Sequence, residues 1–139
     1  MSSVIHSSAI VDSNACLGDN CEVGPYAIIE EGSVVGSNCS IEAHAIIKKR
    51  TVLGRNVRVG HFSVLGGDPQ HLAFDHSVQS SVQIGDEVRI GEGVTVHRSI
   101  YPNGITKVGD LSFLMGYSHV AHDCNLGREV ILANGALLG

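Results

Sequence analysis

Residues 23–47 read VGPYAIIEEGSVVGSNCSIEAHAII, and the residue that opens each group of six in this stretch is Val or Ile. The same register extends in both directions along most of the chain. It places an aliphatic residue at Ile5, Val11, Leu17, Val23, Ile29, Val35, Ile41, Ile47, Leu53, Val59 and Leu65, and later at Ile84, Ile90, Val96, Val108, Leu114, Val120, Leu126, Leu132 and Leu138. The chain is therefore an internal repeat with a period of six residues.

A small residue follows four positions after most of these aliphatic residues, as Ala27, Cys39 and Ala45 do. Both positions are expected to point inward, the aliphatic one at the middle of a flat side and the small one at a narrow corner. Three such sides close one triangular coil of about 18 residues, which is the hexapeptide class of parallel β-helix. We therefore predict an all-β fold of about seven coils that forms one domain over residues 1–139.

Glycine often comes directly after the aliphatic residue, as at Gly36, Gly54, Gly60 and Gly109. Because glycine has no Cβ, it tolerates sharp turns and positive φ angles at little steric cost. These glycines are predicted to lie where the backbone turns sharply or takes a positive φ angle.

Two interruptions of the repeat predict loops that leave the coil. Leu65 and Ile84 are separated by a segment without the six-residue pattern, so we expect an extruded loop near residues 66–82. A second interruption places Pro102 where an aliphatic residue is expected, and proline cannot donate to a strand ladder. Loops on a rigid scaffold commonly carry binding or catalytic residues.

The composition argues against nucleic-acid binding and membrane insertion. The formal net charge is −5 and there is no basic run; the short cluster of Lys48, Lys49 and Arg50 is interpreted as a solvated turn in preference to an anion site. No apolar stretch approaches the roughly 18 residues that cross a bilayer, and no signal peptide precedes the first repeat. We therefore expect a cytoplasmic protein without nucleic-acid partners.

Three histidines stand in the coils that follow the first interruption: His97, His119 and His122. His119 and His122 flank Val120 at outward-facing positions, so they are expected on adjacent sides of one corner. Asp123 follows directly, and a neighbouring carboxylate can orient an imidazole and stabilise its charged form, as a general base requires. Sequence adjacency alone does not establish a hydrogen bond, because successive side chains of a strand face opposite ways. A solvated histidine is the alternative interpretation.

Several segments together resemble one enzyme family, the bacterial UDP-N-acetylglucosamine O-acyltransferases of lipid A biosynthesis. The resemblance covers essentially the whole chain, and His-x-x-His-Asp-Cys at 119–124 is its most specific element. The segments are VTVHR at 94–98, TKVG at 106–109, HVAHDC at 119–124, ILAN at 131–134 and GGDPQ at 66–70. It implies a left-handed β-helix that forms a homotrimer with active sites in the clefts between subunits.

The resemblance also implies a reaction and assigns residues to it. An (R)-3-hydroxyacyl group would pass from acyl carrier protein to the 3-hydroxyl of UDP-N-acetylglucosamine, without a metal or cofactor. His122 would be the general base, and Asp123 would orient or polarise it. Four further residues match positions near the family's substrate cleft and are predicted to bind substrate: Gln70, His97, Met115 and His119.

The chain departs from the family pattern at two places. Residues 71–73 read His-Leu-Ala where the family typically has Asp-Leu-Lys. The family's later coils and its C-terminal helical domain lie beyond Gly139 and have no counterpart in this sequence. From this open end we expect trimers to associate through their C-terminal faces as a dimer of trimers.

Two other functions are considered. A γ-type carbonic anhydrase would bind zinc through three histidines, such as His97, His119 and His122, but that family spaces its paired ligands five residues apart and these are three apart. The stronger alternative is a trimeric β-helix protein that is non-catalytic or acts on a different substrate.

Overall fold

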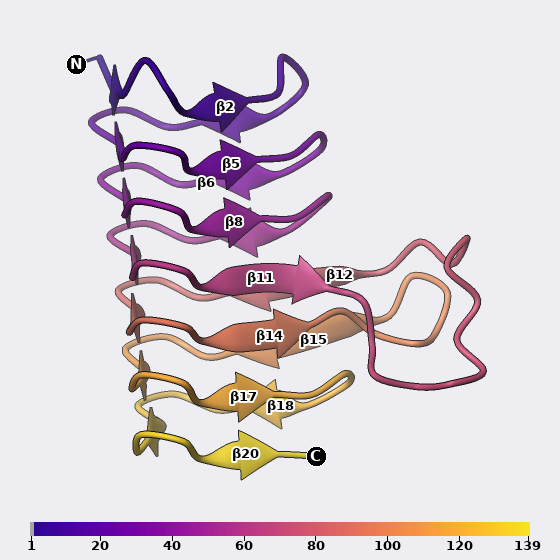
Figure 1. Ribbon diagram of the computed structural model, residues 1–139. Helices are drawn as coiled ribbons and strands as arrows, with labels where there is room; N and C mark the ends of the chain where they lie inside the picture. The colour runs from indigo at the N-terminus through magenta and orange to yellow at the C-terminus, as the bar shows by residue number, and fades with distance from the viewer. Residues whose placement is uncertain (1) are drawn as a thin grey trace.

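The computed structural model describes residues 2–139 as a column of short parallel strands wound into a left-handed triangular coil (Figure 1). The strands of sheet A are β1 (Val4–Ile5), β4 (Glu22–Val23), β7 (Ser40–Ile41), β10 (Arg58–Val59), β13 (Arg89–Ile90), β16 (Phe113–Leu114) and β19 (Ile131–Leu132). Those of sheet B are β2 (Ile10–Val11), β5 (Ile28–Ile29), β8 (Ile46–Ile47), β11 (Val64–Gly67), β14 (Thr95–His97), β17 (His119–Val120) and β20 (Leu137–Leu138). Those of sheet C are β3 (Cys16–Leu17), β6 (Val34–Val35), β9 (Val52–Leu53), β12 (Ser81–Ile84), β15 (Ile105–Val108) and β18 (Asn125–Leu126). No helix within residues 2–139 is long and apolar enough to cross a membrane.

The aliphatic repeat lines the inside of this column, as predicted. Each strand pairs in parallel with the strand one coil away, so that Ile29 aligns with Ile47 and Ile47 with Leu65. These side chains are fully buried, as are the corner residues Ala27 and Ala45. Because every coil repeats the same geometry, the core is a stack of aliphatic ladders without a large aromatic in its interior.

The corners show that the prediction for the glycines was wrong in one respect. The positive φ angle falls three residues after the aliphatic residue, where Asn38 has φ 61° and His44 has φ 62°. Gly36, Gly54, Gly60 and Gly109, which follow the aliphatic residue, have no positive φ, whereas Gly66, which follows Leu65 at the start of the first interruption, has φ 94°. The first four are required by close approach instead: a Cβ built on Gly36 would lie 2.4 Å from the carbonyl oxygen of Gly54 in the next coil.

Both interruptions of the repeat form loops at the corner between sheets B and C, on one side of the column (Figure 1). Loop 1 (residues 68–80) joins β11 to β12, and loop 2 (residues 98–104) joins β14 to β15. The buried guanidinium of Arg98 ties them together. It donates to Asp68 at 2.9 Å and to Ser80, and it lies over the ring of Phe74. The extruded loops thus form one packed unit.

The close approach of the coils predicts a position-specific cost for adding a methyl group. We expect Gly36→Ala to lower the free energy of unfolding by about 1–3 kcal/mol, because backbone atoms of the next coil occupy the space. Gly127→Ala is the matched control, since it occupies the same repeat position with nothing within 4 Å of the added Cβ. Urea denaturation of the two variants measures the difference. Equal stabilities would contradict the assignment of these glycines to close approach.

Candidate active site

His122 and Asp123 lie together on the turn that follows β17, at the corner that carries loops 1 and 2. The Nδ1 atom of His122 is 2.9 Å from Oδ2 of Asp123, so the two adjacent side chains are hydrogen-bonded. Strand alternation does not separate them, because Asp123 is outside the strand and takes a positive φ of 65°. The corner position of the repeat therefore determines the geometry of the hydrogen-bonded pair of His122 and Asp123, which we call the dyad.

Asp123 is held from both sides of its carboxylate. The hydroxyl of Ser99 donates to Oδ1, and the backbone N–H of Ile100 donates to Oδ2 at 3.2 Å. Its own N–H donates to the hydroxyl of Thr106 at 2.9 Å. Burial by itself would raise the pKa of Asp123, but the hydrogen bonds from Ser99, His122 and Ile100 outweigh it and lower the pKa. The carboxylate is thus ionised at neutral pH.

An ionised Asp123 can only accept a hydrogen bond, so Nδ1 of His122 is the donor, and in the neutral imidazole Nε2 is then the unprotonated nitrogen. The His122 side chain is 30% exposed, which leaves it accessible to a substrate. The ring of His71 on loop 1 meets it edge to face, with centroids 6.2 Å apart. A partly exposed imidazole backed by a carboxylate is suited to accept a proton from a hydroxyl group.

His97 and His119 form a second histidine pair with different electrostatics. Their rings are 4.6 Å apart, and Nδ1 of His119 lies 2.7 Å from the hydroxyl of Thr95. Burial, followed by the proximity of His119, lowers the pKa of His97 to about 4. Burial also lowers the pKa of His119, although the hydrogen bond with Thr95 opposes this. Both imidazoles are therefore neutral at neutral pH and can interact with a ligand as uncharged donors or acceptors.

The other residues predicted for the site do not all gather at this corner. Gln70 is exposed on loop 1, at the same corner as the dyad. Met115 follows β16 at the opposite end of the sheet B side, the corner between sheets A and B. Strand β17 separates the two corners, so within one chain the structure does not bring Met115 together with His122.

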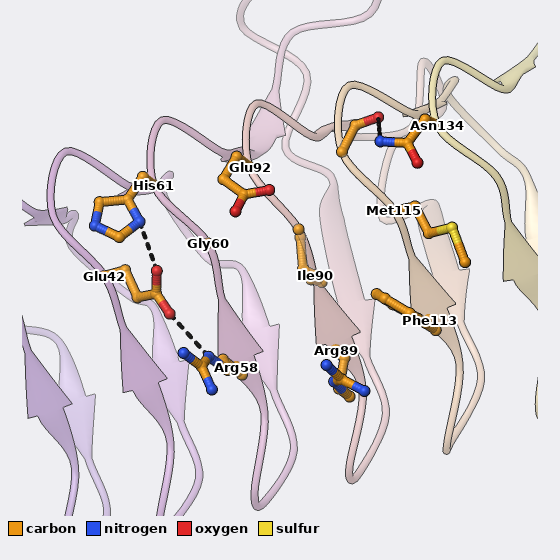
Figure 2. Close-up of a pocket in the computed structure, with 12 residues that line it drawn as sticks. Glu42, Arg58, Gly60, His61, Arg89, Ile90, Glu92, Phe113, Met115 and Asn134 are labelled. Carbon is orange, nitrogen blue, oxygen red and sulfur yellow. Dashed lines mark hydrogen bonds and ion pairs between the residues drawn. The ribbon is translucent and has the colours of Figure 1, made fainter.

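Met115 instead lines a cavity of about 420 Å³ along sheet A (Figure 2). Glu42 anchors one end of this cavity by accepting from Arg58 at 2.8 Å and pairing with His61 at 2.6 Å. At the other end the guanidinium of Arg89 lies over the ring of Phe113. The cavity presents groups of both charges together with the apolar side chains of Ile90, Phe113 and Met115.

Two residues beside the dyad were missed by the sequence analysis as members of the site. Ser99 was not singled out, and His71 was noted only as a departure from the family pattern. Both stand in the loops, where the six-residue period is broken, so the pattern gave no indication of what their side chains contact. The only available signal was their proximity in sequence to His97 and Gln70.

In the cluster of Lys48, Lys49 and Arg50, the two partly exposed lysines form ion pairs with Glu30 and Glu31, each at 3.0 Å. The interpretation as a solvated turn fits the lysines but not Arg50, whose Nε atom is buried without a hydrogen-bond partner. Within residues 2–139, no three His, Cys, Asp or Glu side chains converge in a way that could hold a metal ion.

Comparisons with known proteins agree with this architecture. The family model for bacterial transferase hexapeptide (six repeats) matches residues 2–36 and 32–67. The acyl-[acyl-carrier-protein]–UDP-N-acetylglucosamine O-acyltransferase of Halorhodospira halophila is 50% identical over 135 residues, covering 96% of this chain and 52% of that protein. The corresponding enzyme of Campylobacter concisus is 37% identical over the same shares. The chain thus spans about half the length of the curated relatives it matches.

Solved structures give the same result. The UDP-N-acetylglucosamine acyltransferase of Bacteroides fragilis matches with a TM-score of 0.93 at 33% identity, over 97% of this chain and 52% of that one. The enzyme of Campylobacter jejuni matches with a TM-score of 0.89 at 37% identity, over 96% and 52%. Fold and repeat define a hexapeptide-repeat β-helix protein. Within that class, this chain is a homologue of the UDP-N-acetylglucosamine O-acyltransferases.

The lowered pKa of His97 predicts a specific pH dependence of stability. With a folded-state pKa of about 4 against the ordinary 6.5, His97 binds a proton more readily in the unfolded chain than in the folded protein. The free energy of unfolding is therefore unaffected by this group above pH 6.5 and decreases as the pH falls towards 4. Between pH 7.5 and 5, we expect wild type to lose about 1 kcal/mol more of its unfolding free energy than His97→Gln, a value reduced for partial solvent access. Urea denaturation at the two pH values, with His6→Gln on the exposed first coil as control, measures this. Equal losses in wild type and His97→Gln would contradict a lowered pKa of the half-buried His97.

Proposed function

We propose that this chain carries the catalytic base of an O-acyltransferase that moves an (R)-3-hydroxyacyl group from acyl carrier protein to the 3-hydroxyl of UDP-N-acetylglucosamine. The observation that carries the proposal is the dyad of His122 and Asp123, whose Nδ1 to Oδ2 hydrogen bond leaves Nε2 of a partly exposed imidazole free to accept a proton. Homology to enzymes with this activity supports the choice of substrates.

In the proposed reaction, Nε2 of His122 removes the proton of the sugar hydroxyl as its oxygen attacks the thioester carbonyl carbon. The resulting tetrahedral intermediate re-forms the carbonyl and expels the thiolate of the carrier, which takes the proton back from the imidazolium. Asp123 stabilises the imidazolium between these steps, because its carboxylate is ionised and bonded to Nδ1. Acyl carrier protein and the UDP-sugar are thus the proposed partners.

The neutral histidines and loop 1 are proposed to bind substrate. His119, in the same coil as the dyad, and His97, in the preceding coil, provide uncharged ring nitrogens, and the Nδ1 atom of His97 is buried without a hydrogen-bond partner in the structure. Gln70 lies on loop 1, which also carries His71 to the edge of the His122 ring. These groups surround the dyad with polar side chains that suit a hydroxyl-rich ligand.

We further propose that the chain acts as one β-helical domain that assembles as a homotrimer, with Met115 of one copy completing the site of another. Two observations support this assembly. Met115 and His122 lie at opposite corners of sheet B, so they can share one site only across a boundary between copies. The outward face of sheet B also carries an aliphatic row that the isolated chain leaves partly exposed: Ile10, Ile28, Ile46 and Val64. Burial of such a row is favourable in an oligomer.

The first test of the proposal is the loss of the base. We expect His122→Ala to lower the rate of acyl transfer to UDP-N-acetylglucosamine on the order of a hundredfold or more, because general-base catalysis contributes roughly that factor. Its melting temperature should stay close to that of wild type, since the side chain is partly exposed. His6→Ala, on the exposed first coil, is the control for removal of an imidazole. Equal turnover in wild type and His122→Ala would contradict the assigned base.

The second test concerns assembly. Sedimentation equilibrium at micromolar concentration is expected to give three times the mass of the 14.6 kDa chain. Ile46→Asp places a charge in the aliphatic row and should shift the equilibrium towards the monomer, because burying an unpaired carboxylate is costly. Ser40→Asp, at the outward position of β7 on sheet A, is the matched control. A stable wild-type monomer would remove the shared site.

A further inference from the structure

Ser99, which follows Arg98 in loop 2, is fully buried, and both its hydroxyl and its carbonyl have polar partners. Its hydroxyl donates to Oδ1 of Asp123 and accepts the backbone N–H of Tyr101 at 2.9 Å. Its carbonyl accepts the hydroxyl of Ser80, at the end of loop 1, at 2.6 Å. The side chain therefore faces the dyad, while the backbone is fixed to the other loop.

We infer that Ser99 is a positioning residue for the base, acting on His122 through the carboxylate of Asp123. The inference rests on the proposed function, and it extends the dyad to a chain of three side chains that ends in the loops. Ser99 does not touch the reacting atoms. Its hydroxyl is bonded to the carboxylate, not to Nε2 of His122, and the side chain is fully buried, so it is not placed to attack a substrate.

The physical role follows from the distribution of donors around the carboxylate. Oδ1 is occupied by Ser99, and Oδ2 is shared between the N–H of Ile100 and Nδ1 of His122. Rotation of the carboxylate would break the first of these bonds, so the hydroxyl holds Oδ2 towards the imidazole. A fixed Oδ2 in turn selects the Nδ1–H tautomer and fixes the ring orientation, which determines where Nε2 points.

The same arrangement connects the dyad to the loop that is proposed to bind substrate. Arg98 fixes loop 1 through Asp68 and Ser80, and the next residue, Ser99, fixes Asp123. Two consecutive residues of loop 2 therefore hold the substrate loop and the base in one relative position. Pre-organisation of this kind matters because small misplacements of a reacting group lower rates strongly.

The inference is tested first without any activity measurement, by NMR of the 139-residue chain with labelled histidine and aspartate. Three variants are compared with wild type. Ser99→Ala removes the hydrogen-bond donor, and Ser99→Cys keeps a side chain of similar volume with a weaker donor. Ser112→Ala is the control: it removes a hydroxyl that is as deeply buried as that of Ser99 but lies at a corner between sheets C and A. The titratable groups that face the dyad, His71 and His97, are followed in the same spectra.

We expect Ser99→Ala to raise the pKa of the Asp123 carboxyl, because a hydrogen bond to its charged form is lost, and to broaden the distribution of His122 tautomers. Ser99→Cys should shift both observables in the same direction by a smaller amount, and Ser112→Ala should leave them at wild-type values. If Ser99→Ala does not fold, the pKa of Asp123 and the tautomers of His122 in Ser99→Cys test the inference. Wild-type values in the folded Ser99 variants would overturn the inference.

The kinetic test is a pH profile of acyl transfer. A positioning role predicts that Ser99→Ala lowers kcat roughly tenfold, the factor that corresponds to one charge-assisted hydrogen bond, with KM changed less than about twofold. In Ser99→Ala the acidic limb of the profile should shift along the pH axis, whereas Ser112→Ala should keep the wild-type profile. An unchanged kcat and acidic limb in Ser99→Ala would overturn the role. Absence of transfer in wild type would instead contradict the proposed function and leave the NMR result to decide on the contact itself.

Discussion

The close stacking of one coil on the next is the constraint on which the rest of the structure depends. Backbone N–H groups of each coil donate to carbonyls of the following coil, as from Gly36 to Leu53 at 3.0 Å, and this spacing leaves no room for a Cβ at Gly36. Residues one coil apart then stand in columns. Tyr26, His44 and Phe62 stack their rings in this way with centroid separations of 5.2 and 5.0 Å. The candidate site uses the same columns, because Thr95 and His119 are register partners in adjacent coils.

The insertions leave the core columns aligned, apart from a register shift between Leu65 and Gly67 where β11 leads into loop 1. Loop 2 adds residues between β14 and β15, yet Val96 still aligns with Val120 and Ile84 with Val108. The additional length leaves the column at the corner, where the backbone already turns, so the ladder has no gap to close. The loops therefore bring polar side chains to the corner while the core continues beneath them. Ser99 is placed next to Asp123 by this combination of a continuous ladder and an extruded segment.

The repeat made most of the fold predictable from the sequence, and the limits of the prediction have a physical reason. The period reports which side chains point inward, so the three faces, the buried register and the two loops could be predicted. It does not distinguish a glycine at a positive φ from one at a close approach, since both favour the absence of a Cβ. Contacts within the loops follow no period. The repeat therefore could not predict the hydrogen bond from Ser99 to Asp123 or the contact between the rings of His71 and His122. The placement of Met115 at a different corner follows from the period, but only when its position is counted around the triangle.

The contacts of His97, His119 and His122 explain why His122 is the imidazole that we propose as the base. The rings of His97 and His119 lie against each other, and neither is hydrogen-bonded to a carboxylate. Burial disfavours the charged form of both imidazoles, so neither is suited to hold a transferred proton. His122, in contrast, is hydrogen-bonded to an ionised carboxylate that is itself held by Ser99 and Ile100. Histidines that lie close together in the fold thus differ in their electrostatics because their partners differ. The carboxylate that makes the difference occupies a turn position with positive φ, which the repeat places three residues after Val120 and which leaves its side chain free to turn back towards His122.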